Sequence, residues 1–432
     1  MANFHGKISY MITDKSIEPV PTISAHQVYF MNSRERREAR YQRRKQRRLD
    51  KIHKDNVLYC NENIVFSSKS IANGYKRCRK ISKWKESTQR YGAKLFLRVP
   101  KDSKKLKNET WKPLGFSEFD IIERGKPRHI KSVCIAEKSV QSALSNECLV
   151  PTISKHLIYD NGASLKGKGT SFSEDRFKHH LMSHLQKYGL VGGIFFFDFK
   201  GYFDHIEHKR LKEDTGRILY DNVVRRTYFK MIDAMKTEVG LGLGSQVYQI
   251  SAIFYPNKLD HFMKDDLGIK QYAHFMDDGY IIHSNLNVLK SLKDLFESKC
   301  LENGIIPNKK KCRIVKITKP FIFLKKRYFI TKTHKIVIRN RKDTCVKERV
   351  RLKKFKELLN ESLETFYHIN LNFHSWLCTH IRKTSFHMFI DMIGYFNNLF
   401  KAYGSYTIPN GQGKRKHRKL YRELRMALKL AA

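Results

Sequence analysis

The clearest pattern of hydrophobic and polar positions lies in two short apolar runs that end in acidic residues. Residues 192–199 (Gly-Gly-Ile-Phe-Phe-Phe-Asp-Phe) form a continuous apolar run of buried-strand length, with Asp198 near its end. In residues 272–282, apolar and aromatic residues flank the adjacent acids Asp277 and Asp278 on both sides. The pattern predicts a buried strand leading to the first acid and a β-hairpin that carries the acid pair at its tip.

The acid pair in the hairpin has two interpretations. Asp278-Gly279 is by itself a strong type I′ turn signal, so the pair alone is compatible with an ordinary turn. Two neighbouring carboxylates also repel each other and lose hydration inside a sheet, so they usually need a cation. The hairpin by itself leaves both interpretations open.

Other segments have weaker patterns. Residues 33–50 contain neither Pro nor Gly and predict a helix with Ser33 as its N-cap. Residues 123–133 predict a hairpin turning at Gly125, and helical periodicity follows from Val140 to Leu149.

The remaining polar segments are interpreted as follows. No element is assigned to residues 57–99, and residues 101–113 indicate a polar, basic loop. Residues 162–170 form a glycine- and lysine-rich loop that leads into a helix from Ser173. It lacks the Gly-Lys-Ser/Thr ending of a Walker A sequence, which favours a basic loop contacting a nucleic-acid backbone over a nucleotide cradle.

Three apolar patterns at helical spacing lie near the end of the chain. They fall in residues 352–366, 389–400 and 420–428, with a basic loop at residues 413–419 between the last two. The pattern predicts a basic helical module.

Composition adds a partner class. The 432 residues exceed one typical domain, and the 41% of hydrophobic residues suffices for a sizeable core. Lys and Arg number 85 against 41 Asp and Glu, a net charge of +44 that predicts a polyanionic partner. Nucleic acid is the first candidate and a membrane surface the second, but no run approaches the roughly 18 to 20 apolar residues of a spanning helix.

Cysteine usage and the first residues bear on the compartment. The eight cysteines are scattered, with no Cys-x-x-Cys pair and no zinc spacing, which indicates reduced thiols. Residues 1–10 lack the layout of a signal peptide. We therefore expect a cytoplasmic protein.

The helix predicted over residues 33–50 carries a dense basic stripe. Five arginines fall on one face at a spacing of three to four residues, which suits contact with phosphates better than an ordinary solvated face. A merely solubilising arm is the alternative. The stripe comprises Arg36, Arg40, Arg43, Arg44 and Arg47.

The acids supply candidate chemistry. Asp198 at a strand end and the pair Asp277 and Asp278 at a hairpin tip are the parts of a two-metal site. Two Mg²⁺ ions roughly 3.5 to 4 Å apart lower the pKa of an attacking 3′-hydroxyl and neutralise charge on leaving pyrophosphate. Oxygen ligands suit this hard cation, and Mn²⁺ is a possible substitute.

Several segments, in order, resemble the motifs of reverse transcriptases. Residues 197–206 (Phe-Asp-Phe-Lys-Gly-Tyr-Phe-Asp-His-Ile) resemble the first palm motif, and residues 275–278 (Phe-Met-Asp-Asp) resemble the Tyr-x-Asp-Asp motif with Phe replacing Tyr. Residues 240–260 resemble the second palm motif in its bacterial form. Weaker matches are residues 125–128 with Val140-Gln141 (fingers), 308–311 (after the catalytic hairpin) and 321–324 (primer-grip hairpin). The match covers about residues 120–330.

The resemblance implies a fold and a division of the chain. The fold is α+β, a right-hand polymerase with fingers, a palm with an antiparallel sheet and a helical thumb, plus a basic N-terminal helical extension. The implied boundaries are 1–85 for the extension, 86–190 for the fingers, 191–330 for the palm, and 331–432 for the thumb and C-terminal module.

The resemblance also implies site residues. Phe203 occupies the steric-gate position, where an aromatic ring excludes a ribose hydroxyl, and Lys311 could protonate pyrophosphate or simply be a solvated lysine. The implied metal ligands are Asp198, Phe199, Asp277 and Asp278, of which the three acids are catalytic. The implied nucleotide-binding residues are Lys126, Arg128, Phe203, Gly244, Gln249 and Lys311.

The resemblance implies an RNA-directed DNA polymerase that uses dNTPs and copies a dedicated structured non-coding RNA into cDNA. The motifs are most similar to those of retron, group II intron and defence-associated reverse transcriptases. That similarity implies a role in bacterial antiphage defence. Leu243 stands where many reverse transcriptases carry Gln, and Tyr248-Gln249 replaces the usual Ser-Pro. These departures touch the nucleotide pocket and leave a template-independent or protein-primed polymerase open. A non-catalytic RNA-binding scaffold or maturase that keeps the fold is the alternative from another class. The oligomeric state is not determined by these patterns.

Overall fold

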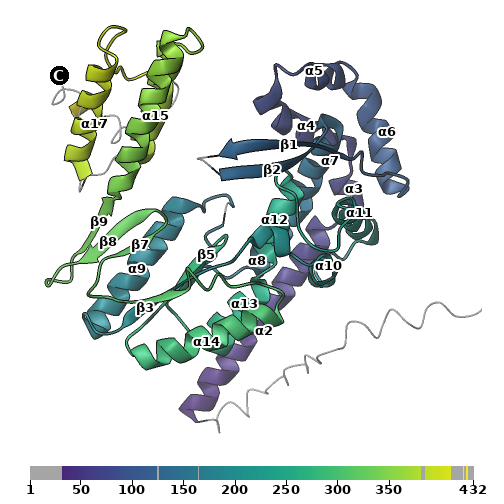
Figure 1. The fold of residues 1–432 in the computed structure, drawn as a ribbon. Helices are drawn as coiled ribbons and strands as arrows, with labels where there is room; N and C mark the ends of the chain where they lie inside the picture. Colours follow the sequence, from purple (N-terminus) through teal and green to yellow (C-terminus); the bar gives the residue numbers. More distant parts are fainter. Residues whose placement is uncertain are drawn as a thin grey trace, which may run out of the picture. The chain divides into compact units, whose positions relative to one another are not determined.

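The computed structural model describes residues 32–123, 126–163, 165–380 and 385–409, together with residues 422, 425 and 426. The chain forms two compact units, and each draws on several stretches of sequence (Figure 1). The first unit consists of the chain up to Tyr159, Lys200–Leu267 and Lys299–Ile306. The second consists of Asp160–Phe199, Gly268–Ser298 and the chain from Pro307 onward.

The first unit is mainly helical, with one two-stranded sheet. Its elements before Tyr159 are α2 (Ser33–Tyr59), α3 (Glu62–Val65), α4 (Ser68–Ser82), α5 (Glu86–Ala93), α6 (Leu95–Lys107), β1 (Phe116–Glu123), β2 (Lys126–Val133), α7 (Ile135–Leu144), the π-helical turn η2 (Ser145–Leu149) and α8 (Val150–His156). From Lys200 onward they are η3 (Tyr202–His205), α10 (His208–Gly216), α11 (Asn222–Asp233), α12 (Gln246–Phe254), α13 (Asn257–His261) and η4 (Phe262–Asp266).

Helix α2 confirms the predicted basic helix but corrects its N-cap. The Asn32 side chain accepts a hydrogen bond from the amide of Glu35, and the Glu35 carboxylate accepts one from the amide of Asn32, both at 2.9 Å. This reciprocal pair is a capping box, so Ser33 is the first helical residue rather than the cap.

Residues 57–113 are more helical than their pattern indicates. The segment predicted as a basic loop over 101–113 is helical as far as Lys107, because Val99, Ser103 and Leu106 point one face of α6 into the core while its lysines remain at the surface. Polar residues on the other face hide this period from a simple reading of the sequence.

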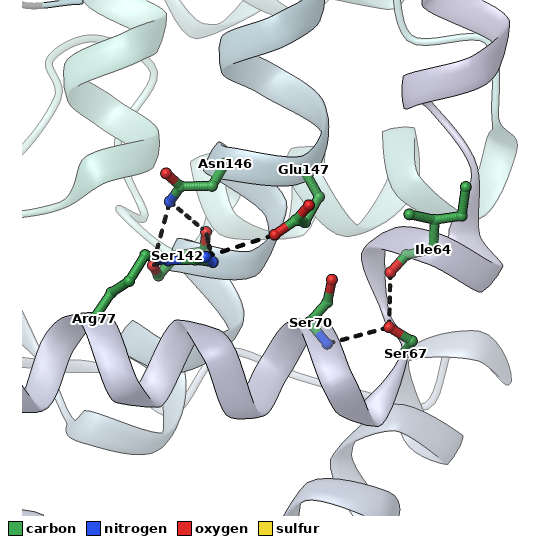
Figure 2. A network of polar contacts seen from close by, with 7 residues as sticks. All are labelled: Ile64, Ser67, Ser70, Arg77, Ser142, Asn146 and Glu147. Carbon is green, nitrogen blue, oxygen red and sulfur yellow. Dashed lines mark hydrogen bonds and ion pairs between the residues drawn. The ribbon is translucent and has the colours of Figure 1, made fainter. Parts of the chain in front are cut away.

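Helices α4 and α7 pack closely through a glycine and a polar clamp. A Cβ on Gly74 would lie 2.2 Å from the carbonyl oxygen of Ser139, so only glycine permits this approach. Figure 2 shows the clamp: the Arg77 guanidinium donates to Oγ and to the carbonyl oxygen of Ser142 at 3.1 and 3.2 Å, and it pairs with Glu147 at 3.6 Å. The confirmed helical segment after Val133 is thereby held in the first unit.

The predicted hairpin over residues 123–133 is confirmed as the antiparallel pair β1 and β2, although its expected turn at Gly125 lies outside the described residues. Strand β2 also contacts the segment before α12. The amide of Lys131 donates to the carbonyl oxygen of Leu243 at 3.1 Å, and Ser245 Oγ donates to Gln141 Oε1 at 2.9 Å. These bonds join the fingers-like hairpin to the segment that resembles the second palm motif.

The second unit is built on a four-stranded antiparallel sheet of order β4-β5-β3-β6. A further sheet of order β7-β8-β9 and several helices complete the unit. The strands are β3 (Gly193–Asp198), β4 (Tyr272–Phe275), β5 (Asp278–His283), β6 (Arg313–Lys316), β7 (Phe321–Phe323), β8 (Lys326–Ile330) and β9 (Ile336–Asn340). The helices are α9 (Thr170–Tyr188), α14 (Leu286–Glu302, of which the residues from Lys299 onward belong to the first unit), α15 (Lys342–Asn360), α16 (Phe366–His380) and α17 (Phe386–Leu399).

Strand β3 is covered on both faces, as its continuous apolar run predicts. Ile194 and Phe196 pack with Phe177 of α9 on one face. Phe195 and Phe197 contact Phe296 of α14, with ring centroids 5.7 and 4.3 Å apart. Because alternate residues of a strand face opposite sides, both helices are needed to bury the run.

The last described helices form their own apolar core around Phe373, Phe389 and Phe396. Helix α15 ends at Asn360, so the predicted helix over 352–366 is too long: Ser362 has φ +58°, and Phe366 begins α16 instead. The predicted helix over 389–400 is confirmed by α17. The pattern over 420–428 and the basic loop over 413–419 lie outside the described residues, save for isolated positions.

Two smaller points complete the fold. Helix α9 begins at Thr170, three residues before the expected Ser173. Within the described residues, no helix combines the length and the apolar character needed to cross a bilayer.

Candidate active site

The predicted hairpin is present as β4 and β5, and it lies beside the end of β3. The antiparallel register pairs Asp198 with Asp278, and Phe275 with Asp278 across the hairpin. The amide of Phe199 donates to the carbonyl oxygen of Asp277 at 2.9 Å. The sheet therefore brings together, in the second unit, the acids that are about eighty positions apart in the sequence.

The turn of the hairpin is Met276-Asp277, not Asp278-Gly279. Of these two central residues, Met276 is the one with positive φ, at +56°. Gly279 lies in β5 opposite Phe197, where a Cβ would stand 2.1 Å from the ring carbon Cζ. The glycine thus makes room for a core ring, and the turn interpretation of Asp-Gly is wrong.

The Asp198 carboxylate is buried and held by two side chains. Asn308 Nδ2 donates to Oδ1 at 2.8 Å, and Lys311 Nζ donates to Oδ2 at 2.6 Å. The amide of Asn308 also donates to the carbonyl oxygen of Asp198 at 2.8 Å. The hydrogen bond to Asp198 raises the pKa of Lys311, so its ammonium is a firm counter-charge at this end of the site.

The pKa of Asp278 is shifted by its surroundings. Burial, and then the negative charges of Asp277 and Asp198, raise its pKa to about 7, while Lys311 opposes the shift. Two carboxylates this close cannot both ionise cheaply without a compensating cation.

The donor set fits a divalent cation, although its side chains are not closed around one point. Among the described residues, no group of three or more His, Cys, Asp or Glu side chains is close enough to hold a metal ion. Asp198 and Asp278 nevertheless offer paired oxygen ligands in register, and Asp277 follows on the adjoining turn. These oxygens suit Mg²⁺, which when bound would lower the pKa of an attacking hydroxyl and neutralise charge on a leaving pyrophosphate.

The protein groups around these acids have roles of their own. Asn308 and Lys311 orient and neutralise Asp198, and the amide of Phe199 ties the turn to β3. The buried aromatic residues beneath the acids keep water away from the back of the sheet. The raised pKa of Lys311 keeps its ammonium protonated beside Asp198.

The other residues implied to bind nucleotide lie in the first unit. Lys126 begins β2, and Arg128 is exposed on the same strand. Phe203 is half-buried in η3, with its carbonyl oxygen accepting from the amide of Leu241 at 2.8 Å. Gly244 has φ +115°, and Gln249 is exposed on α12. Their grouping around one nucleotide stays a prediction.

The basic stripe of α2 is at the surface. Its five arginines are all exposed, as the interpretation as a nucleic-acid contact requires. Two of them donate through Nε to backbone carbonyls one turn earlier, Arg40 to Arg36 and Arg43 to Ala39.

Two residues of the site escape sequence reasoning. Residues 308–311 are marked by their motif, but nothing in the sequence indicates that Asn308 bonds Asp198, which lies 110 positions earlier. His274 is buried next to the acid pair and bonds the turn, but a single His in an apolar strand is indistinguishable from an ordinary core residue in the sequence.

An antiparallel sheet with acids at adjoining strand ends, flanked by helices and followed by a helical module, defines the palm and thumb of a nucleic-acid polymerase. The family model for "Reverse transcriptase (RNA-dependent DNA polymerase)" matches residues 106–336, more than half of the chain. The chain therefore belongs to the reverse transcriptase family, whose enzymes are nucleotidyltransferases that typically use Mg²⁺. A comparison with curated proteins gives no match.

Solved structures with a similar fold include yeast telomerases. Telomerase from Candida albicans, in complex with a TWJ fragment of telomeric RNA, has 13% sequence identity and a TM-score of 0.45, with 75% of this chain and 61% of that chain covered. Apo telomerase from Candida tropicalis has 14% identity and a TM-score of 0.41, covering 74% and 62%. The likeness concerns the fold alone, and this chain spans less than two thirds of these telomerase chains.

Proposed function

We propose that this chain is an RNA-directed DNA polymerase that copies a structured non-coding RNA into cDNA by two-metal nucleotidyl transfer. The observation that carries the proposal is the register of β3 and β5, which sets Asp198 against Asp278 at the strand ends. The raised pKa of Asp278, caused by burial and by the neighbouring acids, is a further reason to expect a cation there. Membership of the reverse transcriptase family supports the reaction type.

An RNA partner agrees with the charge and its location. The net charge of +44 needs a polyanion, and the exposed arginines of α2 offer phosphate contacts beyond the polymerase fold. An A-form duplex would be held through its phosphates and 2′-hydroxyls rather than by base readout. A bacterial lineage related to retrons, and a role in antiphage defence, form part of the proposal through the resemblance of the motifs alone.

The proposal is tested by primer extension on the RNA that co-purifies with the full chain. We expect dNTP incorporation with Mg²⁺ in the wild type and none in the Asp277→Asn, Asp278→Asn double variant. Asp294→Asn is a matched control, because Asp294 is an exposed acid on α14 of the same unit. Full synthesis by the double variant would refute the assignment of the acids.

The same assay separates the alternatives. A scaffold or maturase would bind the RNA equally well in the wild type and the double variant, and neither would incorporate dNTPs. A template-independent enzyme would extend its primer without the RNA after nuclease treatment. Replacing Phe203 with Val should admit rNTPs if its ring is the steric gate, and unchanged sugar selectivity would remove that role.

A further inference from the structure

The turn that carries the acid pair is held in an unfavourable conformation. Met276 has φ +56°, a left-handed value that crowds the Cβ of any L side chain. A positive φ at the first of two central residues is the pattern of a type II′ turn, where glycine is normally found. A methionine there needs neighbouring contacts to keep it in place.

A buried imidazole provides such a contact. His274 is 3% exposed, and its Nε2 lies 2.5 Å from the carbonyl oxygen of Met276. Because a carbonyl oxygen only accepts, Nε2 carries the hydrogen and Nδ1 is left as an acceptor. Nδ1 faces the side-chain amide of Asn161 at 3.5 Å, so both ring nitrogens are engaged in one ring orientation.

The support behind His274 comes from Asp160 and Asn161 and from the start of the glycine- and lysine-rich loop that follows them. Asn161 is itself oriented by that loop: its Oδ1 accepts from the amide of Ala163 at 3.0 Å, and its carbonyl oxygen accepts from Lys168 Nζ at 2.6 Å. The backbone of His274 bonds the same segment, donating to the carbonyl oxygen of Asp160 at 3.3 Å and accepting from the amide of Gly162 at 2.8 Å. This segment therefore supports the hairpin, which the sequence pattern of residues 162–170 does not indicate.

The conformation of the Met276-Asp277 turn determines where Asp277 lies. The carbonyl oxygen of Asp277 accepts from the amide of Phe199, one residue beyond Asp198. A change of Met276 to the right-handed region would rotate the peptide that precedes Asp277. The carboxylate of Asp277 would then move relative to Asp198, while the strand register of Asp278 would be kept.

We propose that His274 is a positioning residue that holds Met276 in the left-handed conformation and thereby sets Asp277 beside Asp198 for binding divalent cations. The inference rests on the proposed function of these acids as metal ligands. It adds to that function a residue outside the metal-ligand set, supported by a loop from an earlier part of the chain.

The first test compares two substitutions of His274 in the full chain. His274→Phe keeps a ring but removes the hydrogen bond to Met276, and we expect it to weaken Mn²⁺ binding, measured by electron paramagnetic resonance of the free ion, about tenfold. His274→Gln can still donate from its amide nitrogen and should restore most of the affinity. In primer extension, kcat should follow the Mn²⁺ affinity while the KM for RNA stays unchanged.

The matched control is another buried histidine that bonds a backbone carbonyl. His184 Nε2 lies 2.8 Å from the carbonyl oxygen of Val191, away from the hairpin turn. His184→Phe should lower the midpoint of thermal unfolding about as much as His274→Phe, yet leave Mn²⁺ affinity within about twofold. Equal loss of Mn²⁺ affinity in both variants would overturn the proposal in favour of general stability.

The second test removes the need for the hydrogen bond. Glycine accepts positive φ without the crowding of Cβ, so in a Met276→Gly background His274→Phe should cost much less Mn²⁺ affinity than in the wild type. A loss as large as in the wild-type background would overturn the proposal. If His274→Phe alone fails to fold, the double variant is compared with Met276→Gly instead, and a loss of Mn²⁺ affinity of about tenfold between these two would overturn the proposal.

The Mn²⁺ titration separates this inference from the proposed function. If the wild type binds Mn²⁺, Asp198→Asn abolishes binding and no dNTP is incorporated, the polymerase proposal fails while the role of His274 is still measured by binding. If His274→Phe folds and binds Mn²⁺ like the wild type while primer extension succeeds, the positioning role fails and the polymerase stands.

Discussion

Gly279→Ala tests the packing that places Asp278 at the end of β5. The added Cβ would lie 2.1 and 2.4 Å from Cζ and Cε2 of Phe197, and 2.8 Å from the carbonyl oxygen of Ala273. The Phe197 ring cannot easily withdraw, since its centroid is 4.3 Å from that of Phe296 and 5.8 Å from that of Tyr272. The strand itself must therefore move.

The magnitude follows from overpacking and displacement. Inserting a methyl into a filled core costs about 1 to 3 kcal/mol, against which the lower chain entropy of alanine returns about 0.5 to 1 kcal/mol. The difference spans about 0 to 2.5 kcal/mol, and contacts as short as 2.1 Å place the expected loss in the free energy of unfolding in the upper half of this range. Asp278 directly precedes Gly279, so a movement of the strand also moves Asp278. A displacement of about 1 Å at a reacting group can reduce the rate roughly a hundredfold.

The assay combines urea denaturation with primer extension. Gly394→Ala is the control, because nothing lies within 4 Å of its added Cβ and it sits inside α17, where alanine should stabilise by about 0.5 to 1 kcal/mol. Leucine at position 197 lacks Cζ and Cε2, so Gly279→Ala should cost less in a Phe197→Leu background. Wild-type stability and rate in the single variant Gly279→Ala would refute the packing argument.

Three further outcomes are expected. Lys311→Met should lower the primer-extension rate about tenfold or more by removing the counter-charge of Asp198, whereas Lys310→Met should not, and equal effects would leave Lys311 a solvated lysine. Glu348 on α15 is buried, which raises its pKa from 4.5 to about 7, so its contribution to stability is fully present below pH 4.5 and is lost as pH rises through 7. The difference in free energy of unfolding between Glu348→Gln and the wild type should therefore shift in favour of the variant by about 1 to 3 kcal/mol from pH 5 to pH 8, measured by thermal unfolding. A difference that does not change with pH would contradict the raised pKa. Replacing the five arginines of the basic stripe of α2 with Gln should weaken RNA binding. It should also reduce the slope of log K (the RNA association constant) against log salt concentration by up to about 4, whereas an unchanged slope would make the stripe a solubilising arm. The residues replaced would be Arg36, Arg40, Arg43, Arg44 and Arg47.

Much of the fold follows from local patterns. The run that becomes β3 is apolar at every position because both faces of the strand are covered, and this length and continuity can be seen without a structure. The hairpins β1-β2 and β4-β5 follow from pairs of short strand patterns close together in the sequence, although the turn of β4-β5 is not the predicted Asp278-Gly279. The ends of helices are harder to predict from the sequence, as those at Asn32 and Asn360 show. A cap depends on one or two hydrogen bonds that several neighbouring residues could make.

Part of the candidate site can likewise be predicted from the sequence and part cannot. Its three acids can be predicted from the sequence, since a carboxylate is costly in an apolar strand and its presence there calls for a reason. Their contacts cannot: residues 308–311 are marked only by the resemblance of their motif, His274 carries no signal at all, and the bonds that these residues make with the acids and the turn form only when the chain folds.

Gly279 shows the difference between what the sequence determines and what only the tertiary structure decides. By itself the sequence determined that an acid pair lies on a hairpin and that a third acid ends a buried strand, because both depend on near neighbours along the chain. Only the tertiary structure decided that the glycine makes room for Phe197 and that the turn is Met276-Asp277. The reason is steric: which side chain needs the space above a glycine depends on a strand some eighty residues away.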